Sequence, residues 1–185
     1  ANNHHFHSSL LREYDIRGVV GKDLNAETVQ EIGQAMGTYM RRQGGKSLVV
    51  GRDVRSSSVE FRDILSQALN STGCDVIDIG MVPTPVAYFA LHHLNADGGV
   101  MITGSHNPPE FNGFKISLGK HSLYGEKIQE LKALIESKIF ETGSGKIEQI
   151  SVMEPYMKNI CSILKISRKV KVVVDGGNGC FGIVG

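Results

Sequence analysis

Residues 98–109 read GGVMITGSHNPP, a short apolar run that leads directly into a loop rich in turn-forming residues. The apolar run predicts a buried strand over 98–102, so Ser105 lies just beyond the carboxyl end of that strand. Open α/β sheets bind their ligands at this edge. Gly104 allows the backbone to turn tightly, and Pro108-Pro109 stiffens the far side of the loop. The stretch therefore predicts a serine hydroxyl held out on a rigid loop at the ligand-binding edge of a sheet.

Helices and strands alternate on both sides of this stretch. Helices are expected over 26–43 (capped by Asn25), 56–72, 83–94, 124–139 and 152–164. Short apolar runs predict further strands over 48–50, 74–80, 114–117 and 170–174. Because strands and helices alternate with short connections, the sequence predicts an α/β fold: a layered α/β/α domain with a mixed, mostly parallel sheet.

The length of 185 residues is enough for one full domain and the start of another. We expect a disordered polar tail over 1–10 and the first domain over 11–142. Residues Thr142-Gly143-Ser144-Gly145 mark the expected boundary. The segment 143–185 is then a linker and the truncated start of a second, similar domain, with an apolar strand followed by a glycine-rich turn.

Composition excludes several classes of protein. With 41% hydrophobic and 21% charged residues the chain is expected to fold, and its formal charge of +1 argues against nucleic-acid or membrane-surface binding. No apolar run approaches the roughly 20 residues of a membrane span, and Ala1–His7 contain no apolar core of a secretory signal. The widely spaced Cys74, Cys161 and Cys180 form neither a disulfide framework nor a zinc pattern, so we expect a cytoplasmic location. The sequence does not indicate an oligomeric state.

Three chemistries compete for the serine loop. A hydrolase elbow needs G-x-S-x-G, but Thr103 and Asn107 stand at the two glycine positions. A Walker-type loop must end in Gly-Lys-Ser/Thr and open a helix, which Pro108-Pro109 prevents. A serine that carries a phosphoryl group fits the pattern; its phosphate, with about −1.5 to −2 charges at pH 7, needs cations nearby, commonly including a metal. A serine that only caps a turn is the plainer alternative.

Four stretches together carry a family resemblance. They are Arg12–Gly18, Gly51–Ser57, the loop Thr103–Asn107 with Asn112–Lys115, and Val172–Gly179. In this order they resemble the N-terminal signature, the second signature, the phosphoserine loop and the opening of the second domain of the α-D-phosphohexomutase superfamily, in particular its bacterial phosphomannomutase/phosphoglucomutase branch. The resemblance runs over essentially the whole chain from about Leu11.

The resemblance implies a reversible phosphoryl shuttle. Ser105 would carry the phosphoryl group, give it to the free hydroxyl of a hexose phosphate, and take the other phosphate back from the hexose 1,6-bisphosphate intermediate. The net reaction interconverts mannose or glucose 1-phosphate and 6-phosphate. The phosphate on Ser105 would also supply one ligand to Mg²⁺. Since the family's other metal ligands belong to a later domain, this chain alone is expected to be inactive.

The resemblance also assigns the supporting residues. Arg17, always protonated and with a planar fork of donors, suits the phosphoryl oxygens. Lys115 can neutralise charge or exchange a proton with the sugar hydroxyl. His106 is the remaining catalytic candidate. Candidate substrate-binding or supporting residues are Tyr14, Asn107 and Arg52.

Other functions stay open at this point. A phosphoglucosamine-type mutase of the same superfamily would share these motifs, and a non-catalytic module could hold a sugar phosphate without chemistry. Residues 177–182 also satisfy G-x-G-x-x-G after an expected strand, a pattern found in dinucleotide-binding folds.

Overall fold

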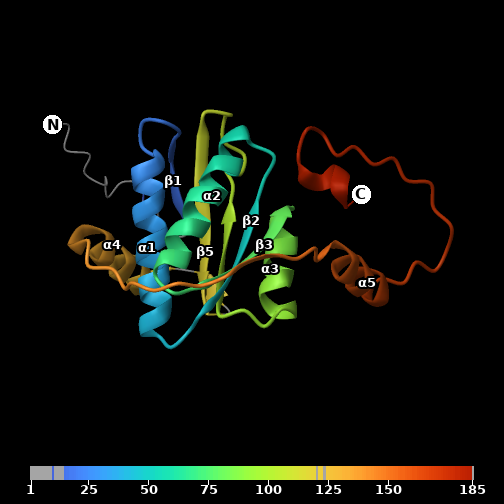
Figure 1. The fold of residues 1–185 in the computed structure, drawn as a ribbon. Helices are drawn as coiled ribbons and strands as arrows, with labels where there is room; N and C mark the ends of the chain where they lie inside the picture. Colours follow the sequence, from blue (N-terminus) through green and yellow to red (C-terminus); the bar gives the residue numbers. More distant parts are fainter. Residues whose placement is uncertain (1–9, 11–14, 120, 123, 185) are drawn as a thin grey trace.

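The computed structural model describes residues 10, 15–119, 121–122 and 124–184. Its strands are β1 (Ile16–Val19), β2 (Ser47–Arg52), β3 (Asp75–Met81), β4 (Gly98–Ile102), β5 (Phe111–Leu118), β6 (His121–Ser122) and β7 (Ile147–Gln149). The helices are α1 (Ala26–Arg42), α2 (Ser56–Ser71), α3 (Thr84–His93), α4 (Glu126–Ser137) and α5 (Met153–Ile163), with a short 3-10 helix η2 (Cys180–Ile183). Figure 1 shows the sheet between the helices and the last segment of the chain running away from them.

The strands form one sheet in the order β1-β5-β4-β2-β3-β7, and β6 pairs with β5. β2 pairs in parallel with β3 and β4, and β3 pairs in parallel with β7. β5 is antiparallel to β1, β4 and β6, so it alone runs against the common direction of the described strands. The expected mixed, mostly parallel sheet is confirmed.

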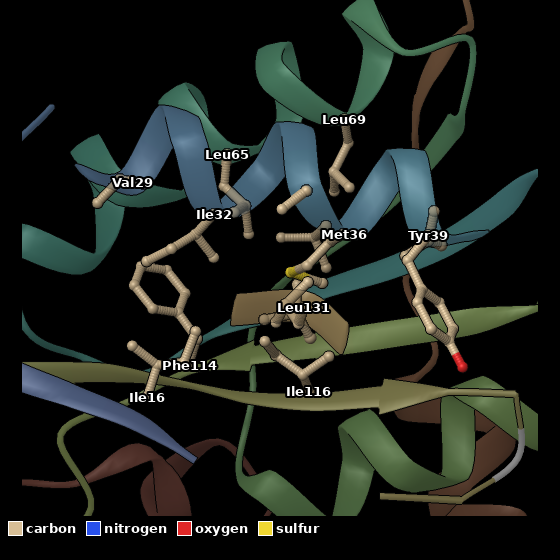
Figure 2. Packing of buried hydrophobic residues seen from close by; sticks show 14 of the residues in the cluster. Ile16, Val29, Ile32, Met36, Tyr39, Leu65, Leu69, Phe114, Ile116 and Leu131 are labelled. Carbon is tan, nitrogen blue, oxygen red and sulfur yellow. The ribbon is translucent and has the colours of Figure 1, made fainter. Parts of the chain in front are cut away.

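Two apolar clusters cover the two faces of the sheet. On one face, α1, α2 and α4 bury side chains such as Ile32, Leu65 and Leu131 against the sheet. Figure 2 shows these residues packed over Phe114 and Ile116 of β5. On the other face, α3 and the start of α5 cover the opposite side of the same strands. The α/β/α layering is therefore confirmed.

Strand alternation assigns each side chain to a layer. In β2, Leu48 and Val50 belong to the cluster under α1 and α2, whereas Val49 belongs to the cluster under α3. The first helix begins where the sequence predicts, because the side chain of Asn25 accepts a hydrogen bond of 2.9 Å from the backbone N–H of Thr28. Because β2 and β4 pair in parallel, up to Arg52 opposite Ile102, their carboxyl ends lie at the same edge of the sheet.

The strand expected over 170–174 does not form. Val173 is 98% exposed, and no neighbouring strand among the described residues offers this segment backbone partners. An apolar run becomes a strand only where its N–H and C=O groups find a ladder. The prediction of a strand here was wrong.

The sheet continues beyond residue 142. Ile147–Gln149 form β7, parallel to β3, and Val152 is buried in the cluster under α3. The division into domains at 142–143 stays a prediction. The tail expected over 1–10 lies outside the described residues except for Leu10, which is buried in the core. No helix in the described part of the chain is both long and apolar enough to cross a membrane.

Candidate active site

The loop between β4 and β5 holds Ser105 in an unusual backbone conformation. Ser105 is exposed, and its φ of 55° lies in the left-handed region that non-glycine residues seldom adopt. Its backbone N–H donates to Oγ1 of Thr103 at 2.9 Å, and the N–H of Asn107 donates to the carbonyl of Gly104 at 3.1 Å. The expected position of Ser105, just beyond the carboxyl end of β4, is where the structure has it.

A second segment, directly after β2, braces this loop. Arg55 donates to four backbone carbonyls of the loop and to the carboxylate of Asp53. The acceptors are the carbonyl oxygens of Ser105 (3.3 Å), Asn107 (2.6 Å), Pro108 (2.7 Å) and Phe111 (2.9 Å), and Oδ2 of Asp53 (3.2 Å). The other oxygen of Asp53 accepts from the hydroxyl of Ser58 at 2.6 Å. The sequence analysis missed Arg55, although it lies within the resembling stretch Gly51–Ser57.

A cleft of about 650 Å³ opens beside the loop. Ser105, His106 and Asn107 line it from the loop, and Arg55 lines it from the segment after β2. Residues 178–181 line it from the far end of the chain. Of the candidate site residues, Ser105, His106 and Asn107 therefore line the cleft, whereas Arg17, Lys115 and Arg52 do not.

Arg17 contacts the loop from β1. It lies on β1, which pairs with β5 so that Arg17 is opposite Gly113. Its guanidinium forms an ion pair with Asp15 and donates from Nη1 to Oδ1 of Asn107 at 3.1 Å. Its Nε is buried and has no hydrogen-bond partner among the described residues. Arg17 is thus tied to the serine loop through Asn107.

Lys115 belongs to the same group of charges. It lies on β5, and its Nζ is 4.0 Å from the carboxylate of Asp15, which also pairs with Arg17. Asp15 is mostly buried, with 10% of its side chain exposed. One carboxylate therefore holds two cations beside the loop, leaving the group a net positive charge that suits a phosphate.

The remaining candidates make no described hydrogen bond or ion pair with the serine loop. Arg52 donates to the carbonyl of Asp53 at 3.1 Å, its Nε is buried without a partner in the described structure, and it does not line the cleft. Tyr14 lies outside the described residues. Burial, with the carboxylate of Asp53 nearby, raises the pKa of Cys180 above that of an ordinary thiol.

The dinucleotide pattern over 177–182 does not have the context it needs. That turn requires a preceding strand and a following α-helix. Here residues 165–176 form no strand among the described residues, and η2 is a single 3-10 turn. The glycines therefore do not build a nucleotide-binding turn in this structure.

Residues 8–142 match the model of the family "Phosphoglucomutase/phosphomannomutase, alpha/beta/alpha domain I". The chain belongs to this family. It is 46% identical over 177 residues to a phosphomannomutase/phosphoglucomutase of Pseudomonas aeruginosa, and 38% identical over 175 residues to a phosphoglucomutase of Neisseria meningitidis. These alignments cover 96% and 94% of this chain and 38% of each relative.

The fold agrees with a solved member of the family. The crystal structure of a phosphoglucomutase/phosphomannomutase family protein from Burkholderia thailandensis matches with a TM-score of 0.91 and 44% identity, covering 97% of this chain and 41% of that one. The chain thus spans about two fifths of the length of the relatives it matches. The expected membership of the phosphohexomutase superfamily is confirmed.

Proposed function

We propose that the full-length protein is a phosphohexomutase that interconverts the 1- and 6-phosphates of mannose or glucose through a phosphoserine at Ser105. The observation that carries the proposal is the exposed Ser105, which lines a cleft and lies on a loop that Arg17 contacts through Asn107, with Lys115 near the carboxylate that pairs with Arg17. Phosphoryl transfer depends mainly on positioning and on stabilising charge, and this arrangement supplies both.

In the forward step, the bond between phosphorus and Oγ of Ser105 breaks as a bond to the sugar hydroxyl oxygen forms. We assign the proton of that hydroxyl to His106, because it is exposed and lines the same cleft as Ser105. Arg17 and Lys115 offset the negative charge of the phosphoryl oxygens. The hexose 1,6-bisphosphate then turns round and returns its other phosphate to Oγ of Ser105. The sugar oxygen that this transfer releases takes the proton held by His106, so the serine ends the cycle phosphorylated and His106 returns to its starting state.

Magnesium belongs to this proposal through one ligand only, the phosphate on Ser105. The described residues contain no group of three or more His, Cys, Asp or Glu side chains that could hold a metal. Asp53, the carboxylate that contacts the loop, already accepts from Arg55 and Ser58. The residues described here do not complete a metal site, so we propose that this chain alone has negligible mutase activity. We also propose a cytoplasmic location, from the cysteine usage alone.

The test uses the full-length protein with Mg²⁺, glucose 1-phosphate or mannose 1-phosphate, and a trace of glucose 1,6-bisphosphate. We expect formation of the 6-phosphate, and mass spectrometry should find phosphate on Ser105. Ser105→Ala should abolish both, whereas Ser144→Ala, at an exposed serine after α4, should abolish neither. Turnover that survives in Ser105→Ala would refute the proposal. Faster conversion of glucosamine 1-phosphate than of either hexose phosphate would move the assignment to a phosphoglucosamine-type mutase.

A further inference from the structure

The hydrogen bonds of Arg55 leave it nothing with which to bind a substrate. A guanidinium has five N–H donors. The five bonds described above use all of them: the one N–H of Nε, both of Nη1 and both of Nη2. Only 14% of its side chain is exposed. Although it lines the cleft, all five of its donors are occupied by acceptors of the protein itself.

The other two arginines near the loop differ in this respect. Arg17 has a buried Nε without a partner among the described residues, and so has Arg52. Among the described residues, Arg17 uses only one N–H of each Nη, and Arg52 uses only one N–H of Nη1, so each keeps N–H groups that could donate to a phosphate oxygen. Arg55 therefore differs in role from Arg17 and Arg52, although all three lie near the same loop.

The acceptors of Arg55 span the whole serine loop. They begin at the carbonyl of Ser105 itself and end at that of Phe111, the first residue of β5. The guanidinium also lies so close to Gly104 that a Cβ at that position would overlap its central carbon. The carboxylate of Asp53 joins Arg55 to the start of the loop. It accepts from the backbone N–H and Nε of Arg55 and from the N–H of Gly104 at 3.3 Å.

We infer that Arg55 is a positioning residue that fixes the backbone of the serine loop, and with it the direction of Oγ of Ser105, for phosphoryl transfer. The inference rests on the proposed function. Ser105 must meet two different sugar oxygens in line during one cycle, so its oxygen needs the same direction in both steps. A displacement of about 1 Å at a reacting atom can cost roughly a hundredfold in rate. A loop with a serine at positive φ needs such outside support to keep that direction.

The experiment compares Arg55→Met and Arg55→Lys with the unmodified full-length protein. Methionine keeps an unbranched apolar side chain but removes all five donors, and lysine keeps the charge but not the planar fork. The matched control is Arg62→Met on α2, because Arg62 is 20% exposed and bound to Asp78 at 3.0 Å but makes no described contact with the loop. For each variant we would measure kcat and KM, the melting temperature, and amide hydrogen exchange of residues 103–111.

We expect Arg55→Met to lower kcat about a hundredfold with KM changed less than about threefold. The kcat of Arg55→Lys should lie between that of Arg55→Met and that of the unmodified protein. Amide exchange over 103–111 should become faster in both. Arg62→Met should leave kcat within about twofold of the unmodified protein, even if it lowers the melting temperature as much as Arg55→Met does. If Arg55→Met does not fold, Arg55→Lys carries the same test.

Two results would overturn the inference: unchanged exchange of the loop in a folded Arg55 variant, or a loss of kcat in Arg62→Met equal to that in Arg55→Met. The exchange measurement does not depend on turnover. Absence of mutase activity and of phosphate on Ser105 in the unmodified protein would instead refute the proposed function. The two failures are therefore distinguishable.

Discussion

Arg17 and Asn107 lie 90 residues apart in the sequence and are joined by a hydrogen bond of 3.1 Å from Nη1 to Oδ1. The bond connects β1, at the edge of the sheet, to the loop that carries Ser105. Because Arg17 also pairs with Asp15, its guanidinium is held at two points while its Nε stays free of partners in the described structure. Such an arrangement fixes a cation beside the serine loop, and one N–H on each Nη has no partner among the described residues.

A double-mutant cycle tests this connection. Arg17→Lys should lower kcat/KM of the full-length protein roughly a hundredfold, because an ammonium lacks the planar fork with which the guanidinium contacts Asp15 and Asn107 from separate nitrogen atoms while facing a phosphate oxygen. Asn107→Ala should lower it less. The double variant should cost less than the sum of the two, with a coupling of about 1–2 kcal/mol. Arg17→Lys combined with Asn159→Ala, on the exposed face of α5, should be additive; additivity in the first cycle would show that the bond does not matter for catalysis.

A separate prediction concerns Asp75, at the start of β3. The backbone N–H of Lys146 donates to its Oδ1 at 2.8 Å, and Nζ of Lys46 lies 3.4 Å from its Oδ2. The hydrogen bond from Lys146, helped by the charge of Lys46, lowers the pKa of Asp75 below its ordinary value. The folded protein therefore favours the charged carboxylate, which joins β3 to the segment that leads into β7.

Because the pKa of Asp75 is lower in the folded state, its contribution to stability is present above the ordinary aspartate pKa of about 3.9 and is lost as the pH falls below that value. Asp75→Asn keeps the shape of the side chain but not its charge. We expect the variant to melt at a lower temperature than the unmodified chain at pH 7, and the difference to shrink as the pH falls below about 3.9. Melting curves across this range would test it; a difference that persists undiminished at pH 3 would contradict it.

The sequence predicts those parts of the fold whose signal is local. The apolar run over 98–102 coincides with β4, because all five of its residues are buried and their pattern needs no other information. The expected helix begins at Ala26, directly after its cap Asn25, because the capping contact acts within a single turn. Ser105 was found in the same way, from the turn residues that follow a strand.

Features that depend on distant contacts could not be predicted. β1 contains Arg17 and Gly18 between two apolar residues, and it forms because β5 offers it a ladder. Residues 170–174 have a stronger apolar signal and no described partner strand, so they form no strand and stay exposed. The role of Arg55 was hidden because its acceptors on the serine loop lie 50 to 56 residues further along the chain.

Gly104 provides a test of how tightly the loop is packed. A methyl group at this position would overlap the guanidinium carbon of Arg55, whose five hydrogen bonds keep it from moving aside. Gly104→Ala should therefore destabilise the protein by about 1–3 kcal/mol, in the range of overpacked sites, and should lower kcat. Gly182→Ala, where nothing lies within 4 Å of the new Cβ, is the control for thermal melting and turnover. Equal effects of the two substitutions would show that the loop adapts to the added methyl.

The segment after residue 142 makes contacts whose strength can be measured on this chain. Val152 is 1% exposed and packs with Ile79 and Val86 under α3, and the ring of Tyr156 meets that of Phe89 edge-on at 5.4 Å. These contacts indicate that the start of α5 packs against α3 and stabilises the domain.

Val152→Ala should lower the free energy of unfolding by about 1–3 kcal/mol, because it removes two methyl groups from a packed apolar cluster. Val173→Ala makes the same chemical change at a side chain that is 98% exposed, and it should change stability by less than about 0.5 kcal/mol. Urea unfolding of the chain and of both variants would give the two values. If the two substitutions cost the same, the segment 147–156 is not part of the unit that unfolds with the sheet, and the boundary expected at 142–143 separates it in energy as well as in sequence.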